Sequence, residues 1–160
     1  MRSGDTMCAS LSTDDRQIRD FVPHVIRMCH ADKTDHITIA GRRAIQTVLD
    51  LCRRGFMHVM CRTASPGPHG SENSADSLWI LNVPSETELG AHIVELAPNL
   101  RKGGSLIVGF EVSISSDHAA RLKQVLLNMD FVTVQQQKDK HGRTLLICGR
   151  QEPRAHAQAA

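Results

Sequence analysis

The stretch ADSLWILNVPSETELGAHIVELAPNLRKGGSLIVGFEV, residues 75–112, decides the fold. Its segment Ser77–Val83 is nearly all apolar, as a central parallel strand covered on both faces should be. Ser85 then opens a helix, because the glutamate three residues later completes a capping box. Gly103-Gly104 predicts a turn into a second apolar strand over 105–112. Strand, helix and strand in this order indicate an α/β fold.

The chain before this stretch repeats the same alternation. Apolar residues at helical spacing predict a helix over Asp14–His30, which Pro23 either kinks or divides. His36–Gly41 reads as a strand, Arg43–Arg54 as an amphipathic helix, and Met57–Cys61 as a second strand. Such a strand–helix–strand unit crosses over right-handedly into a parallel sheet.

The chain after this stretch predicts one more helix and a hairpin. Ser115 or Ser116 caps a helix with an apolar inner face. The segments Phe131–Gln137 and Arg143–Cys148 follow as two strands. Gly142 supplies the positive φ that a tight connection between them needs.

The domain organisation follows from these elements. Residues 13–150 form a single domain, and the polar segments 1–12 and 151–160 are expected to be flexible tails. Residues 63–76, rich in Pro, Gly and Ser, are expected to form a mobile loop. No room remains in that loop for a further helix and strand.

Composition excludes several function classes. A net charge of +2 and an aromatic content of 3% are too low for a nucleic-acid-binding surface. No apolar run is long enough to span a bilayer, and the first residues lack the apolar centre of a secretory signal. Five cysteines without a CxxC spacing favour free thiols, with Cys52, Cys61 and Cys148 expected in the core. We therefore expect a cytoplasmic protein.

The segment LAPNLRKGGSLIV, residues 96–108, resembles the helix end and Gly-Gly turn before the late strand of class I S-adenosylmethionine-dependent methyltransferases. The NMDF turn before the terminal hairpin is similar to the same family. The resemblance implies a three-layer α/β sandwich with a mostly parallel, Rossmann-like methyltransferase-type sheet and a C-terminal antiparallel hairpin. The third strand of that sheet is expected to be missing. A generic doubly wound α/β sheet is the alternative.

The resemblance places the S-adenosylmethionine site at the turn after the first strand. In the family this turn is rich in glycine, so that its backbone approaches the cofactor closely. The matching turn here is Ala40, Gly41, Arg42 and Arg43, with one glycine and two long cations. Such cations would crowd the sulfonium-bearing cofactor.

The other landmarks of the family also differ. An acidic residue that binds the ribose hydroxyls usually ends the second strand, where this chain has Cys61 and Arg62. The residue that contacts adenine after the third strand has no counterpart. Asp76 resembles the acidic entry to the fourth strand and is expected to be a turn residue.

Polar residues after the later strands are the weak candidates for catalysis. Asn82 and Pro84 stand where nucleic-acid amino methyltransferases carry an Asn/Asp-Pro-Pro-aromatic motif, without its second proline and aromatic residue. Ligands bind at the carboxyl ends of strands in open α/β sheets. Asn82, Ser85 and Glu111 are therefore the candidate catalytic residues.

Two other kinds of site need comparison. Gly41, Arg42 and Arg43 at a helix N-terminus, with Arg62, could hold a phosphate, although no GxGxxG accompanies them. Surface charge is the simpler interpretation of these arginines. Metal ligands are not expected, because the Cys, His and Asp residues of the segment 29–36 follow no zinc pattern and the HxxC of residues 58–61 lies on a strand.

These observations lead to a degenerate methyltransferase-like domain that is non-catalytic and binds a small-molecule ligand, a protein partner or a second copy of itself. One alternative is an active S-adenosylmethionine-dependent methyltransferase with a divergent site. The other is an α/β module that binds a phosphate-bearing nucleotide. An exposed apolar patch where the third strand should pair favours the partner, whereas a concave pocket above Gly41 reached by an acidic group favours the enzyme.

Overall fold

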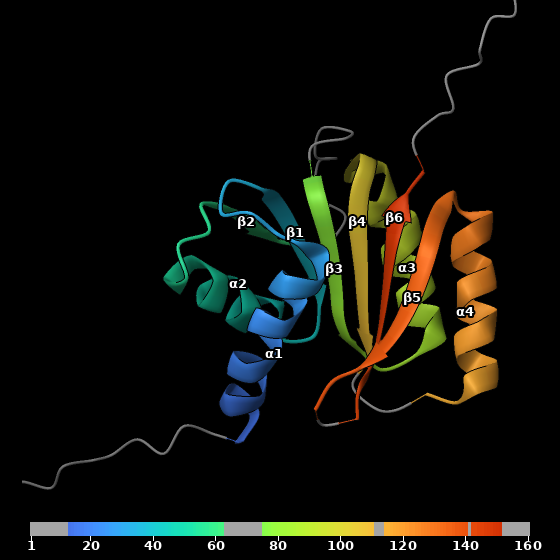
Figure 1. The fold of residues 1–160 in the computed structure, drawn as a ribbon, viewed down its shortest axis with the longest axis horizontal. Helices are drawn as coiled ribbons and strands as arrows, with labels where there is room; N and C mark the ends of the chain where they lie inside the picture. The colour runs from blue at the N-terminus through green and yellow to red at the C-terminus, as the bar shows by residue number, and fades with distance from the viewer. Residues whose placement is uncertain (1–12, 63–74, 111–113, 141, 152–160) are drawn as a thin grey trace, which may run out of the picture.

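The computed structural model describes residues 13–62, 75–110, 114–140 and 142–151, which form one sheet with helices on both faces (Figure 1). The elements, in chain order, are α1 (Thr13–Cys29), β1 (His36–Gly41), α2 (Ala44–Arg53), β2 (His58–Cys61), β3 (Ala75–Val83), α3 (Glu86–Leu96), a 3₁₀ turn η1 (Ala97–Asn99), β4 (Leu100–Phe110), α4 (Ser116–Asn128), β5 (Phe131–Lys138) and β6 (Thr144–Arg150).

The six strands lie in the order β2-β1-β3-β4-β6-β5. The first four are parallel, and β6 and β5 add an antiparallel hairpin at the far side. The predicted α/β sandwich with a mostly parallel sheet and a terminal hairpin is confirmed. In the described ranges no strand lies beyond β2, which is the position of the expected missing strand.

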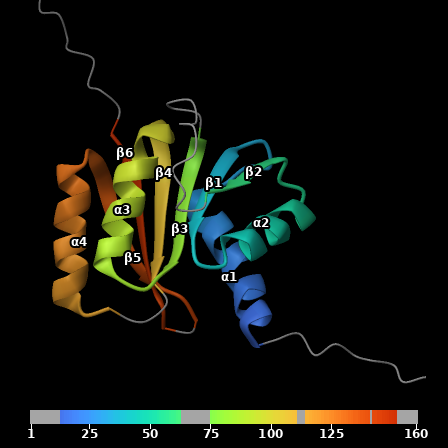
Figure 2. The same ribbon diagram turned by 180° about the vertical axis from the view of Figure 1, so that it is seen from behind.

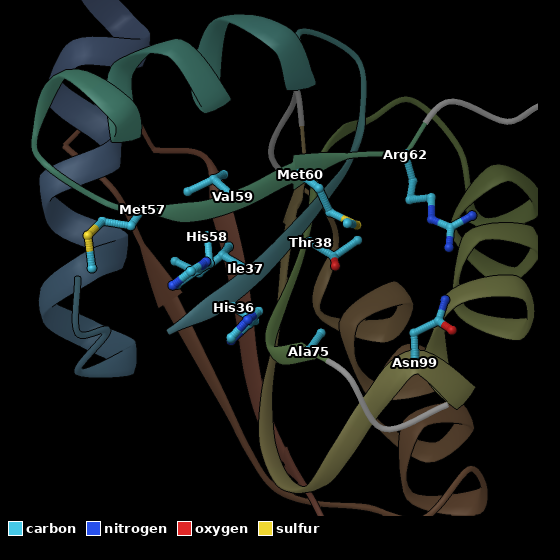
Figure 3. A pocket seen from close by; sticks show the side chains of 10 residues that line it. All are labelled: His36, Ile37, Thr38, Met57, His58, Val59, Met60, Arg62, Ala75 and Asn99. Atoms are coloured by element: carbon cyan, nitrogen blue, oxygen red, sulfur yellow. The ribbon is translucent and has the colours of Figure 1, made fainter. Parts of the chain in front are cut away.

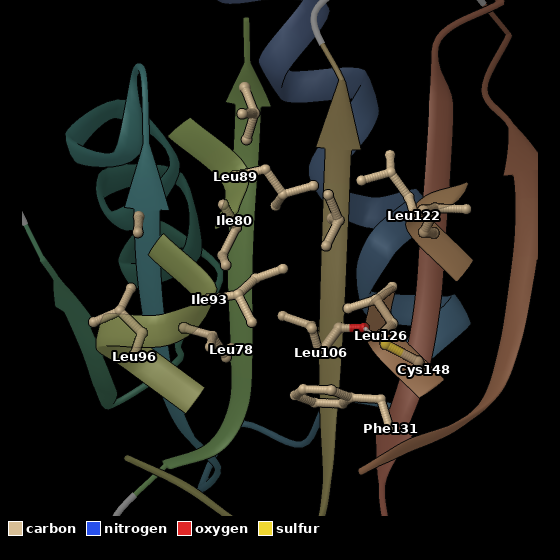
Figure 4. Packing of buried hydrophobic residues seen from close by; sticks show 14 of the residues in the cluster. Leu78, Ile80, Leu89, Ile93, Leu96, Leu106, Leu122, Leu126, Phe131 and Cys148 are labelled. Atoms are coloured by element: carbon tan, nitrogen blue, oxygen red, sulfur yellow. Dashed lines mark hydrogen bonds between the residues drawn. The ribbon is translucent and has the colours of Figure 1, made fainter. Parts of the chain in front are cut away.

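Two helical layers cover the two faces of the sheet. Helices α1 and α2 lie on one face, and α3 and α4 lie on the other (Figures 1 and 2). The alternation of β3 supplies both cores, because Trp79 and Leu81 pack toward α1 and α2, whereas Leu78 and Ile80 pack toward α3 and α4 (Figure 4). This two-sided burial explains why β3 is nearly all apolar.

Local sequence signals set the helix ends as predicted. Gly55 has a φ of +91°, and the Phe56 amide donates to the Leu51 carbonyl oxygen at 3.1 Å, so α2 ends in a Schellman motif. Ser85 caps α3 by accepting a hydrogen bond from the Glu88 amide. Ser115 caps α4 by accepting one from the amide of His118.

Several predicted boundaries differ from the structure. Helix α1 is continuous and includes Pro23, so the chain is not divided there. Leu100 begins β4 and does not continue the preceding helix. Gly103-Gly104 therefore lies inside a strand, in an irregularity where residues 101–104 stand opposite a single residue of β3. A large β-bulge replaces the predicted turn, because Leu100 before it and Ser105 after it both pair with β3.

Asp76 belongs to β3 and is not a turn residue, so the predicted loop 63–76 ends two residues early. Its carboxylate accepts hydrogen bonds from the His36 amide at 2.8 Å and from Arg101 Nε at 2.5 Å. The carboxylate thus joins β1, β3 and the bulge of β4. Partial burial raises the pKa of Asp76, but the His36 amide and the Arg101 guanidinium outweigh that effect and lower its pKa below the usual value.

Parts of the predicted organisation fall elsewhere. The expected tail 1–12, residues 152–160 of the expected tail 151–160 and the loop segment 63–74 lie outside the described residues. Gln151, the first residue of the second tail, donates its amide to the Asp130 carbonyl oxygen at 2.8 Å. Among the helices that are described, none combines the length and the apolar character needed to cross a membrane.

The carboxyl ends of β1 and β3 approach each other closely at Gly41. Gly41 pairs with Leu81 and has a φ of +99°. A Cβ atom built on Gly41 would lie 2.0 Å from the Leu81 carbonyl oxygen. Only glycine fits both the backbone conformation and the space at this point of the sheet.

Replacing Gly41 by alanine should therefore lower the free energy of unfolding by at least ~2 kcal/mol. The measurement is urea denaturation of both proteins. Gly90→Ala is the matched control, since nothing lies within 4 Å of a Cβ atom at that helical position and alanine should stabilise it by about 0.5–1 kcal/mol. Equal stability of the Gly41→Ala variant and the wild type would contradict the packing argument.

Asp76→Asn should destabilise the protein at pH 7 by ~1 kcal/mol, because the amide keeps the shape but loses the charge. The lowered pKa in the folded state means that the ionised carboxylate stabilises the fold above its ordinary pKa of about 3.9. That contribution disappears as pH falls through the lowered native pKa. Denaturation curves of both proteins should therefore converge below about pH 4, and a constant difference from pH 7 to pH 3 would exclude the charge as its cause.

Candidate functional site

Three of the predicted site residues, Gly41, Arg42 and Asn82, lie together at the carboxyl ends of β1 and β3. Asn82 Nδ2 donates a hydrogen bond to the Arg42 carbonyl oxygen at 3.2 Å. Asn82 has a φ of +54°, and Arg43, the residue after Arg42, has a φ of +61°. Together with the close contact at Gly41, this hydrogen bond ties the two strand ends to each other.

Two of the candidate residues, Ala40 and Ser85, have structural roles. The Ala40 side chain is fully buried in the core between β1 and the α3 layer, so it offers no surface to a ligand. The Ser85 hydroxyl accepts the capping hydrogen bond from Glu88. Glu111, the third candidate for catalysis, lies outside the described residues.

Cys61 and Arg62 lie beside the end of β1. Cys61 pairs with Ile39, and the Arg62 amide donates to the Ile39 carbonyl oxygen at 2.8 Å. Partial burial raises the pKa of the Cys61 thiol, which keeps the sulfur protonated at neutral pH. This strand end therefore presents a thiol and a cation, and neither side chain can accept two hydroxyl hydrogen bonds as a carboxylate does.

A cavity of about 300 Å³ lies on the face of β1 and β2 opposite α2 (Figure 3). Helix α3 covers β3 and β4 on this face of the sheet but leaves β1 and β2 open (Figure 2). The residues lining the cavity are His36, Ile37, Thr38, Met57, His58, Val59, Met60, Arg62, Ala75 and Asn99. Arg62 is the one lining residue that the sequence analysis had proposed for cofactor binding.

The imidazole rings of His36 and His58 stack in this cavity, with centroids 4.4 Å apart and planes at 10°. The two residues pair directly across β1 and β2. The sequence analysis considered each of them only as a metal ligand. Their contact could have been predicted, because each histidine stands at the start of one of two neighbouring parallel strands.

The chemistry of the cavity suits binding. Arg62, Asn99 and Thr38 supply hydrogen-bond donors, while Met60 supplies apolar surface. Among the described residues that line the cavity, none carries a carboxylate. Throughout the described residues, no group of three or more His, Cys, Asp or Glu side chains has the arrangement of a metal site. The cavity therefore fits a small molecule with acceptor groups and an apolar part.

No protein-family model matches the sequence, and no curated protein does either. Solved structures do match the fold. The S-adenosylmethionine-dependent O-methyltransferase of Thermotoga maritima superposes with a TM-score of 0.60 at 12% identity, over 84% of this chain and 66% of that chain. This chain thus spans just under two thirds of that protein's length.

Two further structures match over most of both chains. The release-factor-specific protein-(glutamine-N5) methyltransferase of Alicyclobacillus acidocaldarius has a TM-score of 0.54 at 15% identity, over 86% of this chain and 93% of that chain. A protein in a complex with the Haloferax volcanii Trm112 methyltransferase activator gives 0.62 at 10% identity, over 89% and 95%. The fold of this chain is therefore the Rossmann-like fold of class I S-adenosylmethionine-dependent methyltransferases.

Proposed function

We propose that this chain is a degenerate methyltransferase-like domain, which binds a ligand or a protein partner and does not transfer a methyl group. The closed end of β1 and β3 carries the proposal. The backbone at Gly41 packs against the Leu81 carbonyl oxygen, and Asn82 fills the neighbouring position by bonding the Arg42 carbonyl oxygen. In the proposed domain Gly41 therefore allows β1 and β3 to pack closely, where the family uses a glycine to let the backbone approach the cofactor.

The groups around this edge do not fit S-adenosylmethionine. A ribose needs an acceptor for its two hydroxyl groups, and the end of β2 offers the Cys61 thiol and the Arg62 guanidinium. The turn after β1 carries two further arginines, whose charge opposes that of a sulfonium ion. The hydrogen-bond donors at this edge are therefore suited to an anionic ligand or to a neutral polar ligand.

Other observations support a binding role. The cavity on the open face of β1 and β2 has polar groups convergent on an apolar wall, as small-molecule sites do. The similar protein found with the Trm112 activator shows that this fold can be part of a two-protein complex. Free thiols at Cys29, Cys52, Cys61 and Cys148 suit a reducing compartment, and we place the protein in the cytoplasm.

An active methyltransferase with a divergent site at 40–43, 61–62 and 82–85 is the alternative function. One observation favours it: Gly41 and Asn82 lie at the same edge of the sheet, where open α/β folds bind their ligands. In that case Asn82 would orient the methyl acceptor, and its bond to Arg42 would have to open.

Isothermal titration separates the two functions. We expect no saturable heat when S-adenosylmethionine or S-adenosylhomocysteine is added to the folded wild-type protein, because the edge of the sheet is closed and lacks a ribose acceptor. Circular dichroism of the same sample checks the folding. Micromolar binding of either compound that Asn82→Ala weakens would establish the methyltransferase instead. Titration with inorganic phosphate and with ATP tests the nucleotide-binding module in the same way.

A further inference from the structure

Exposed apolar side chains gather around β2, at one end of the sheet. Four of the seven large hydrophobic side chains that are exposed in the described residues lie in α2 or in the segment 57–60. Their exposed fractions run from 50% for Leu49 to 66% for Met57. We call this region the edge surface, and it consists of Ile45, Leu49, Cys52, Met57 and Met60.

The helical part of the edge surface faces away from α1. Ile45, Leu49 and Cys52 follow one another at spacings of four and three residues and therefore share one face of α2. Arg54 lies on the other side of the helix, where it lines a cavity with residues of α1. The apolar face is thus a second one, separate from the face that buries Leu51 in the core. Cys52, expected in the core, is exposed for this reason.

The strand part of the edge surface has backbone groups that face outward. In the described residues β2 pairs with β1 alone. The Arg62 amide is directed at β1, so the alternation along the chain directs the backbone groups of Val59 and Cys61 to the open side. Their side chains are half-buried against the α2 layer. An added strand would find both hydrogen-bonding groups and apolar side chains here.

The opposite end of the sheet gives the contrast. Strand β5 also pairs with a single neighbour, β6, in the described residues. It carries Gln135, Gln136, Gln137 and Lys138, and three of these four side chains are exposed. Polar and charged residues of this kind are how proteins protect an edge strand from pairing. Among the described residues, the edge at β2 has no such polar row, and β2 is only four residues long.

Charge decides which partner fits the edge surface. Arg53, four residues after Leu49 in α2, is exposed, and Arg62 directly follows β2, whereas the one acidic residue of 42–62, Asp50, is 7% exposed. That carboxylate already accepts a hydrogen bond from Arg54 at 2.8 Å. Two copies of this surface would bring like charges together, which costs free energy, whereas an acidic segment would be attracted.

We propose that the edge surface docks an acidic, extended segment of another protein, which adds a strand beside β2. Apolar side chains of that segment pack on Ile45, Leu49 and Cys52. The side chains that alternate with them are Asp or Glu. They lie on the face of the sheet opposite α2, near His58 and Arg62. Because β2 has only four residues, apolar contact supplies more of the affinity than backbone pairing. The inference deepens the proposed binding role by naming the class of partner.

The test is a selection of twelve-residue peptides from a random display library, with the full chain as bait. We expect enriched peptides to alternate apolar and acidic residues. Synthetic copies should bind more weakly as salt rises, because exposed charges are screened. In the complex, amide hydrogen exchange should slow at Val59 and Cys61. Basic consensus sequences, no consensus at all, or protection confined to β5 would overturn the proposal.

Two variants locate the binding. Leu49→Glu should weaken binding of the selected peptides by about tenfold or more, since it places a charge among the apolar contacts. Val94→Glu is the matched control, because Val94 is 69% exposed on α3 and distant from β2; it should leave the affinity unchanged. Circular dichroism melting curves show that both variants fold. Equal losses in the two variants, or none in either, would contradict the assignment of the surface.

Sedimentation velocity tests the competing occupant. A wild-type dimer that becomes a monomer in Leu49→Glu would overturn the proposal in favour of a second copy of the chain. The cofactor titration is independent of these results. Peptide binding together with S-adenosylmethionine binding would keep the docking surface and reject the closed cofactor edge, whereas neither kind of binding would reject the docking surface alone.

Discussion

The structure depends on the burial of β3 on both faces between two helical layers. Leu78 and Ile80 lie against α3, and Trp79 and Leu81 lie against the α1 and α2 layer. The strand also satisfies its buried polar groups, since Trp79 Nε1 donates to Ser77 Oγ at 2.8 Å. Pairing of β1 and β4 on its two sides follows from this position, and so does the place where the strand ends can meet a ligand.

The same central packing limits what the strand ends can do. Parallel strands pressed together at Gly41 and Leu81 leave no room for a side chain, so the glycine serves strand packing. Asn82 continues the closure by bonding the backbone after β1. The end of β2 has a thiol and a guanidinium where a ribose would need an acceptor, which supports the proposal that this edge is a structural junction. The open face and the open edge of β1 and β2 are then the proposed binding surfaces.

The two ends of the sheet differ. In the described residues, the end at β2 has an exposed apolar helix face and a strand that pairs on one side only. At the opposite end, glutamines and a lysine on β5 protect the edge strand from pairing with another strand. In the described residues one end of the sheet is thus polar and the other apolar, and Arg53 and Arg62 favour the acidic partner that we propose for the apolar end.

The sequence by itself determined the element order, the helix caps at Ser85 and Ser115 and the glycine at the end of α2, because periodicity and capping are local. It also placed Gly41 and Asn82 at one edge, since carboxyl ends of parallel strands meet. Only the tertiary structure decided that the Leu81 carbonyl oxygen occupies the space beside Gly41 and that Asp76 joins three strands. It also decided that Gly103-Gly104 lies in a bulge and that Cys52 faces outward. Each of these depends on which segments become neighbours across the sheet, and contacts between distant residues leave no periodic signal in the chain.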